Sequence, residues 1–368
     1  MSRPEPPPGP PIAMLAELTH RCPLRCAFCS NPLALEPASA ELGTAQWTAV
    51  LRQAADLGVM QVHFSGGEPT VRKDLEVLVA EAAGAGLYTN LITSGVLLTA
   101  ERCKRLAGEG LEHVQLGLPD IDEDGGLAIT AFKGGVAKKL EAAGHIRAAG
   151  LALTVNAVIT RHNAARVERM IDTAVDLGAR RVEIANVQYY GWALQNRATL
   201  MPSAAQLKEM TAVVLAARDR LKGRLVIDYV IPDYYARKPK SCMGGWGRQF
   251  FNVNPAGRVL PCHAAETIPH LEFQSVLDVP LRDIWEHGPA FAAYRGDAWM
   301  PKGCRSCERK EQDWGGCRCQ ALALAGDAGA IDPTCDVSPL HDGVRALAEA
   351  EAAAGDDRIA WRSFTFSG

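Results

Sequence analysis

The chain has 368 residues, of which 48% are hydrophobic and 22% charged, and its formal net charge at pH 7 is −3. This length and composition support one large globular domain and a smaller one. A charge so near zero gives no reason to expect nucleic-acid binding, and the longest apolar runs are too short to cross a membrane. The Pro-rich start lacks the apolar core of a secretory signal, so we expect a disordered tail over 1–12 and a cytoplasmic protein.

Short runs rich in β-branched residues recur along the first part of the chain and predict strands, which span 12–19, 59–65, 87–93, 112–118, 151–160 and 180–190. Between them, apolar residues at three- and four-residue spacing predict amphipathic helices, for example at 44–58, 73–86 and 164–178. Strand–helix units in tandem predict an α/β fold over 13–230, a partial (β/α)6 TIM-like barrel that is open on one side. The active site of such a barrel lies at the C-terminal ends of its strands.

The character of the sequence changes after about residue 230. The segment 231–340 is rich in Gly, Pro and aromatic residues, and its later part is dense in cysteine. We interpret it as a second, loop-rich domain that is too small to form much core and is held together by metal. The final segment, 341–368, is predicted to form a surface helix followed by a loose tail.

Eleven cysteines in a chain expected in a reducing compartment indicate metal binding rather than disulfides. Cys22, Cys26 and Cys29 follow the first predicted strand directly, so their thiols belong at the mouth of the barrel. A structural zinc would need a fourth ligand, for which His20 and His63 are candidates. A [4Fe–4S] cluster held by three thiolates instead leaves one iron free to bind another molecule.

The spacing Cys22-x3-Cys26-x2-Cys29, with Phe28 before the last thiolate, resembles the signature of the radical S-adenosylmethionine (SAM) superfamily. The sequence SGGEP at 65–69 resembles the GGEP motif of the same superfamily, although such a sequence also forms ordinary turns. The resemblance implies that the open iron chelates the amino and carboxylate groups of SAM.

The same resemblance implies SAM contacts from the ends of several strands. Two glycines would let the backbone approach a ligand closely, and Glu68 with its backbone would hold the SAM ammonium. The candidates at the end of the third and fifth strands could equally be ordinary strand-end residues. The complete set of cofactor-binding candidates is Phe28, Gly66, Gly67, Glu68, Pro69, Ser94 and Asn156.

The later cysteines resemble the iron–sulfur SPASM domain of radical SAM peptide-modifying enzymes. Asp313 stands where that family usually has a cysteine, and a carboxylate can ligate iron. The family's interleaved scheme implies two auxiliary clusters, each [4Fe–4S] or [2Fe–2S], with Cys242, Cys262, Cys317 and Cys319 on the first and Cys304, Cys307, Asp313 and Cys335 on the second. Two zinc sites, a zinc–cluster hybrid, or a surface Asp313 with water as the eighth ligand are the alternatives. Cys103 lies in a helical pattern and is predicted to be a buried core residue.

Over most of the chain the resemblance is closer, to the PqqE family of radical SAM enzymes in pyrroloquinoline quinone (PQQ) biosynthesis. The stretches that carry it span 15–36, 63–76, 89–98, 242–266 and 313–335. The resemblance implies that a radical made from SAM cross-links a Glu side-chain carbon to a Tyr ring carbon in the precursor peptide PqqA, presented by the small chaperone PqqD. It also implies an electron donor such as a flavodoxin, and an auxiliary cluster that accepts the electron released by the ring. The segment 116–135 is more acidic and irregular than the family leads us to expect.

No base for the ring proton is identifiable from the sequence; His63, Asp120 and Tyr189 lie near predicted strand ends and are weak candidates. Two other functions are considered. One is another SPASM enzyme that forms a thioether or oxidises Ser or Cys, against which Asp313 and the Cys317/Cys319 pair count. The other is a non-enzymatic electron-transfer or scaffold protein, against which the SGGEP motif and the barrel periodicity count.

Overall fold

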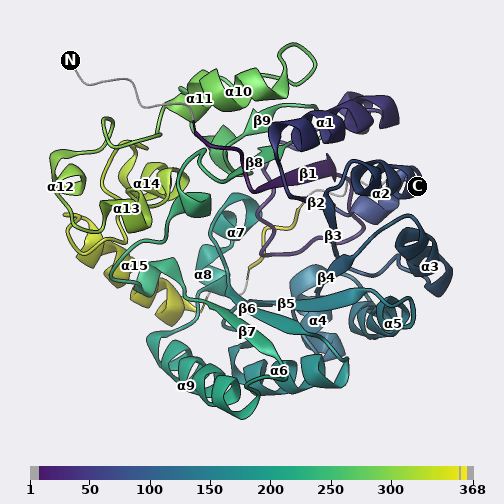
Figure 1. Cartoon of the computed structure of the whole chain (residues 1–368). Coiled ribbons are helices and arrows are strands. Elements are labelled where there is room, and N and C mark those ends of the chain that lie inside the picture. The colour runs from purple at the N-terminus through teal and green to yellow at the C-terminus, as the bar shows by residue number, and fades with distance from the viewer. Residues whose placement is uncertain (1–7, 356–357, 363–368) are drawn as a thin grey trace.

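A nine-stranded sheet in the order β7-β6-β5-β4-β3-β2-β1-β8-β9 forms the centre of the computed structural model, which describes residues 8–355 and 358–362. Strands β1 to β8 pair in parallel and β9 runs antiparallel to β8. Figure 1 shows the sheet curving between its helices, and the linear strand order leaves the barrel open as predicted. The strands are β1 (Ala13–Thr19), β2 (Gln61–Gly66), β3 (Tyr88–Thr93), β4 (His113–Gly117), β5 (Ala152–Ile159), β6 (Arg181–Asn186), β7 (Val226–Val230), β8 (Phe250–Val253) and β9 (Val259–Leu260).

The predicted strands are confirmed as β1 to β6, and three strands were not expected. One of these, β8, lies in the segment assigned to the second domain, yet it pairs with β1 in parallel from Ala13 opposite Phe250 onwards. Phe251 and Trp285 belong to the same buried cluster as Met14. The interpretation of 231–340 as a segment with little core of its own is therefore incomplete, because part of it extends the barrel sheet and its core.

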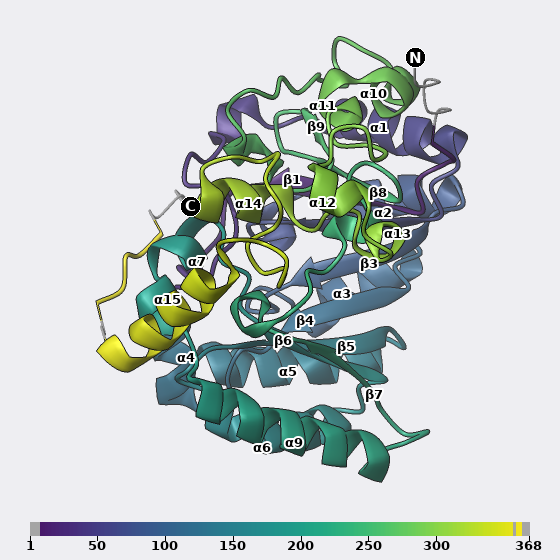
Figure 2. The ribbon, with the colours of Figure 1, turned by 90° about the vertical axis from the view of Figure 1, so that its left-hand side faces the viewer.

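Helices cover the outer face of the sheet, while the cysteine-rich segment lies on the other side. Figure 2 shows α5, α6 and α9 below β5, β6 and β7, with α12, α13 and α14 above them. Among the described residues, no helix has both the length and the apolar character that crossing a membrane requires. The helices are α1 (Thr44–Leu57), α2 (Leu75–Gly84), α3 (Ala100–Gly108), α4 (Glu123–Thr130), α5 (Gly135–Ala148), α6 (Val167–Asp176), α7 (Gly191–Gln195), α8 (Arg197–Leu200), α9 (Ala204–Arg220), α10 (Leu281–His287), α11 (Pro289–Ala292), α12 (Lys302–Arg305), α13 (Lys310–Asp313), α14 (Arg318–Ala325) and α15 (His341–Ala354).

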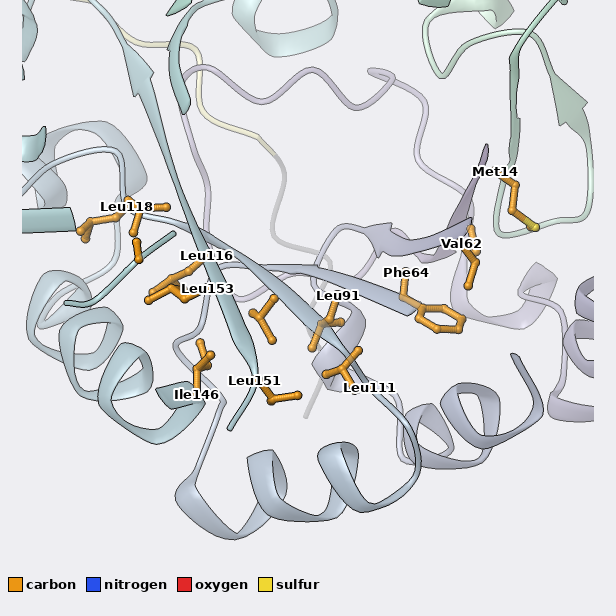
Figure 3. Packing of buried hydrophobic residues seen from close by; sticks show 14 of the residues in the cluster. Met14, Val62, Phe64, Leu91, Leu111, Leu116, Leu118, Ile146, Leu151 and Leu153 are labelled. Carbon is orange, nitrogen blue, oxygen red and sulfur yellow. The ribbon is translucent and has the colours of Figure 1, made fainter. Parts of the chain in front are cut away.

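Alternation along the strands separates an apolar face from a polar one. The apolar face packs against the helices, and Figure 3 shows Val62, Phe64 and Leu91 among its buried side chains. Residues between these positions, such as His63, point to the opposite face and are half-buried. The inner face of the barrel therefore carries polar groups.

The N-terminal segment packs more closely than the sequence predicts. Residues 1–7 of the predicted tail lie outside the described residues. Beyond them, Gly9 O accepts a hydrogen bond from Trp285 Nε1 at 3.1 Å, and Ile12 N donates to Gln249 O at 2.8 Å. The prediction of disorder is therefore wrong for 9–12.

The C-terminal helix lies on the surface with one face buried, but the residues described beyond it are not a loose end. Val344, Ala348 and Ala352 share one face of α15 and are buried, and α15 packs against α8. Beyond the helix, residues 358–362 return to the barrel, where the side chain of Arg362 is buried. Residues 356–357 and 363–368 lie outside the described part of the chain. The prediction of a loose tail is wrong for 358–362, because these residues are packed.

Candidate functional site

Three cysteines lie on the loop that leaves β1, residues 22–29, which we call the thiol loop. Two of its backbone N–H groups reach the end of α4: Arg25 N donates to Thr130 O and Ala27 N donates to Ile129 O, both at 2.9 Å. Carbonyls in the last turn of a helix have no partner within the helix, so α4 offers them to the loop. The irregular acidic segment after the fourth strand, which contains α4, thus supports the thiols.

Burial makes free thiolates costly in this loop. It raises the pKa of Cys22 well above the ordinary value and that of Cys26 to about 12, and a neighbouring thiol adds to each rise. A metal centre supplies the positive charge that makes buried thiolates favourable. All eleven cysteines are free thiols. The donor set of the thiol loop fits a [4Fe–4S] cluster with one iron that lacks a cysteine ligand.

Both histidines considered as a fourth zinc ligand have a ring nitrogen engaged within the protein. His20 Nδ1 accepts a hydrogen bond from Glu36 N at 2.8 Å, and His63 Nδ1 lies 2.8 Å from Asn90 Nδ2. In residues 8–355 and 358–362, no three His, Cys, Asp or Glu side chains are arranged to hold a single metal ion. The candidate metal ligands are therefore identified by which thiols lie close together and by the resemblance in sequence described above.

The glycines of the SGGEP motif allow the chain to pass close to its own backbone. A Cβ on Gly66, which has φ +123°, would lie 2.2 Å from Thr19 O, and a Cβ on Gly67 would lie 2.5 Å from Arg21 O. The backbones are also hydrogen-bonded, from Gly67 N to Thr19 O at 2.7 Å and from Glu68 N to Arg21 O at 2.8 Å. We expected these glycines to admit a ligand. Their immediate role is to tie the end of β2 to the residues that precede Cys22.

The carboxylate of Glu68 orders the site from inside the protein. It is fully buried and accepts hydrogen bonds from Thr70 Oγ1 and Thr93 Oγ1, both at 2.6 Å, and from Ser94 N at 2.8 Å. The hydroxyl of Ser94 also donates to it. Both carboxylate oxygens are thus committed to the ends of β2 and β3, and the side chain positions Ser94. Pro69, also buried, starts the 3-10 helix that follows.

A buried lysine joins this site and was missed by the sequence analysis. Lys139 is 3% exposed, and its Nζ donates to Gly117 O at 2.6 Å and to Ser94 O at 3.0 Å, which links the ends of β3 and β4. Burial lowers its pKa, while the nearby Cys26 and Glu68 oppose that shift. A signal was present: Lys139 falls in the apolar stripe of α5 that contains Val136, Ala142, Ala143 and Ile146.

A second missed group lies on the inner face of the sheet. Asn156 Nδ2 donates to Glu183 Oε2 at 2.5 Å, and Gln115 Nε2 donates to the same oxygen at 3.2 Å. Burial raises the pKa of Glu183, and the Asn156 hydrogen bond partly offsets the rise. Asn156, a predicted SAM contact, is therefore part of a polar row across β4, β5 and β6, in which Glu183 is the titratable group.

The three weak candidates for a base lie in different surroundings. Burial lowers the pKa of His63 on the inner face of β2. Asp120 is fully buried and accepts a hydrogen bond from Arg166 Nε at 2.9 Å, and this ion pair indicates a structural role. Tyr189 donates to Met201 Sδ at 3.3 Å, and burial raises its pKa well above the ordinary value.

Two further residues of the sequence analysis lie in hydrophobic surroundings. Cys103 is 1% exposed within the main core, which confirms it as a core residue. Phe28 is half-buried and packs against the cluster that contains Ala27 and Tyr189.

Four of the later cysteines meet in one buried group. The thiols of Cys242 and Cys319 donate hydrogen bonds to those of Cys262 and Cys317, which holds the pKa of the two acceptors well below the ordinary value. Tyr190, on the loop after β6, places its hydroxyl 2.8 Å from Cys317 Sγ. These are the residues predicted to share the first auxiliary cluster, and Tyr190 joins them to the barrel.

The other four predicted ligands surround a separate small cavity of about 20 Å³, lined among others by Cys304, Cys307, Asp313 and Cys335. Asp313 is 8% exposed, so it is not a surface carboxylate. Trp314, Gly315 and Gly316 follow it with positive φ values, in a tight turn that sends the chain to the first group. The fold therefore sorts the later cysteines into the two predicted sets.

Family models match two parts of the chain. Residues 16–174 match the radical SAM superfamily and residues 242–308 match an iron–sulfur cluster-binding domain, SPASM. A protein of Rhodopseudomonas palustris named PqqA peptide cyclase is 58% identical over 357 residues, which cover 97% of this chain and 95% of that protein.

Solved structures show the same fold at low sequence identity. Streptococcus suis SuiB bound to S-adenosylmethionine superposes with a TM-score of 0.72 and 20% identity, covering 89% of this chain and 77% of SuiB. SuiB bound to its precursor peptide SuiA gives a TM-score of 0.70 and 20% identity over 89% of this chain and 76% of that one.

Proposed function

Because the chain belongs to the PqqA peptide cyclase family of radical SAM enzymes, we propose that it joins a Glu side-chain carbon to a Tyr ring carbon within a PqqA peptide. The observation that carries the proposal is 58% identity to a PqqA peptide cyclase over 97% of this chain, together with an SGGEP motif whose backbone bonds the residues just before the thiol loop. The substrate of the family is a PqqA peptide, and the fold is shared with a radical SAM enzyme bound to its own precursor peptide.

We assign the first [4Fe–4S] cluster and SAM to Cys22, Cys26 and Cys29 with the end of β2. When bound, these groups supply the radical that removes a hydrogen atom from the Glu side chain, and the auxiliary clusters supply an acceptor for the electron that the ring releases. Glu68 and Lys139 hold the ends of β2, β3 and β4 in place around the site. The barrel keeps the reacting carbons together and excludes water.

The polar row on the inner face contains a carboxyl group, Glu183, that we propose as the acid–base group the sequence did not identify. Burial raises the pKa of Glu183, which makes its carboxylate a stronger proton acceptor than an exposed one and suits it to take up the proton lost by the Tyr ring. We propose this role for Glu183 in preference to Asp120, whose carboxylate is paired with Arg166.

The downstream ligands are proposed as two auxiliary clusters, in the two sets that the fold keeps apart. We retain 13–230 as the barrel domain and 231–340 as the SPASM domain, with the correction that β8 and β9 belong to the barrel sheet. Presentation of the peptide by PqqD and reduction by a flavodoxin-like donor complete the proposal. A cytoplasmic location agrees with the free thiols that cluster assembly needs.

Anaerobic reconstitution with iron and sulfide tests the function. Incubation with dithionite, SAM, PqqA and PqqD is expected to give 5′-deoxyadenosine and a peptide lighter by two hydrogens, with the change mapped to Glu and Tyr. A thioether, an oxidised Ser or Cys, or an unchanged peptide from a fully loaded enzyme would contradict the proposal.

A further inference from the structure

The residues after the C-terminal helix form a strap, residues 358–362, that lies against the thiol loop. Asn196 of the α7–α8 connection joins the two segments, since its Nδ2 donates to Ala27 O at 2.9 Å and to Ala360 O at 3.0 Å. Its Oδ1 accepts from Ala360 N at 2.7 Å. One amide side chain therefore fixes the backbone of the strap to the backbone of the loop. Figure 1 draws the strap in yellow, crossing the centre of the view.

Further contacts hold both ends of the strap. Thr199 Oγ1 donates to Arg358 O at 3.0 Å at its start. At its end, Arg25 Nε donates to Arg362 O at 2.7 Å, and the Arg25 guanidinium lies over the Trp361 ring. Arg25 belongs to the thiol loop, so the loop and the strap hold each other by backbone and side-chain contacts.

The strap delivers one cation to the thiols. Arg362 is 2% exposed, its Nη1 lies 3.8 Å from Cys29 Sγ, and its Nη2 donates to the carbonyl of His20. A single guanidinium thereby spans the loop from the residues before Cys22 to its last cysteine. Its Nε is buried with no hydrogen-bond partner among the described residues, so the group retains donor capacity inside the site.

Resting on the proposed function, we propose that Arg362 is a positioning residue of the first cluster: it donates to the Cys29 thiolate and holds the thiol loop in the form that binds the cluster. A positive charge and an N–H donor at a ligating sulfur stabilise the reduced cluster, which carries more negative charge, and so raise its reduction potential. Burial strengthens this effect because water does not screen the charge. No sequence motif marks the residue, which lies well beyond the last cysteine.

Two substitutions separate the charge of Arg362 from its shape. Arg362→Gln removes the charge, and Arg362→Lys retains it. We expect the Gln variant to lose iron from the first cluster roughly tenfold faster under a chelator, a usual effect for a group that bonds a metal ligand. Its first cluster is expected to have a lower midpoint potential in an EPR redox titration. The Lys variant is expected to lie closer to wild type in both measurements.

The part of the reduced EPR signal that changes on adding SAM identifies the first cluster in the intact protein. Arg220→Gln is the matched control, because Arg220 forms an exposed surface ion pair with Asp172. If Arg362→Gln fails to fold, Asn196→Ala releases the strap while leaving Arg362 in the chain, and it is expected to shift the potential in the same direction. A potential and an iron-loss rate equal to wild type in the folded variants would overturn the inference. A wild-type protein with no SAM-sensitive cluster would instead contradict the proposed function.

Discussion

The thiol loop and the downstream cysteines hold their sulfur atoms by different means. Downstream, Cys242, Cys262, Cys317 and Cys319 contact one another, and a second set lines its own cavity. The thiol loop has three cysteines. Its backbone is held by α4 and, through Asn196, by the strap, while the SGGEP segment holds the residues just before the loop. A metal centre whose coordination is completed by protein ligands links the segments that carry those ligands. A centre with one coordination position left open depends more on the surrounding protein to keep its ligands in place. In the proposed assignment, the open site is therefore supported by the surrounding protein, and the closed sites by contacts among their own ligands.

The largest expected effect comes from loosening the support of the thiol loop. Glu68→Ala leaves Thr70, Thr93 and Ser94 without their acceptor, so we expect 5′-deoxyadenosine formation to fall roughly 100-fold, the upper end for groups that orient a metal site. Iron in the auxiliary sites is expected to stay. Glu101→Ala, at a carboxylate whose side chain is 83% exposed, is the control. Unimpaired SAM cleavage by Glu68→Ala would show that the end of β2 needs no such support.

A substitution among the downstream ligands is expected to keep the cluster and change its reduction potential. Asp313→Cys replaces a hard carboxylate by a thiolate in the second cavity, so we expect unchanged iron content, a changed potential and lower cross-linking. Iron analysis, EPR and peptide mass spectrometry measure the three quantities. Wild-type cross-linking and potential would mean that Asp313 is not a ligand.

A smaller effect is expected where the barrel contacts the downstream cysteines, through Tyr190. Tyr190→Phe removes the hydroxyl at Cys317 Sγ, so we expect a lower potential of that auxiliary cluster. Cross-linking should fall about fivefold, equivalent to one ordinary hydrogen bond of ~1 kcal/mol. Tyr88→Phe is the control, because Tyr88 lies at the start of β3 and is 39% exposed. Equal cluster potentials and equal cross-linking in the two variants would show that the Tyr190 hydroxyl does not affect the cluster.

The smallest effect is expected at the cysteine outside both regions. Cys103→Ala deletes one buried sulfur from the core, so we expect a loss of about 1 kcal/mol in unfolding free energy. Iron content and SAM cleavage are expected to stay at wild-type levels. Iron loss in this variant would contradict the assignment of Cys103 to the core and would indicate that it is a ligand.

The sequence predicted the parts of the fold in which local pattern and tertiary environment agree. The first six strands alternate with amphipathic helices and are all present, and Cys103 is in the core. The strand β8 was not predicted, because its four residues lie in a Gly- and Pro-rich segment and pair with β1, which is far away along the chain. Pairing of that kind leaves no local periodicity to read.

The sequence predicted which residues belong to the site better than it predicted what each of them does there. The cysteines group as expected, but Gly66 and Gly67 serve the approach of two backbones, and the Glu68 carboxylate bonds other side chains. Lys139 could have been found from its place in an apolar stripe. Arg362 could not, because only the folded chain brings the strap to the thiol loop.

We propose that one cluster, held by Cys22, Cys26 and Cys29, has an iron open to SAM while the downstream centres are closed. Electron–nuclear double resonance on the reduced holoenzyme with SAM labelled by ¹⁵N at its amino group tests this directly. We expect ¹⁵N coupling to one cluster, which is lost in Cys26→Ala while the auxiliary signals persist. Coupling that survives in Cys26→Ala, or none in the fully loaded wild type, would contradict it.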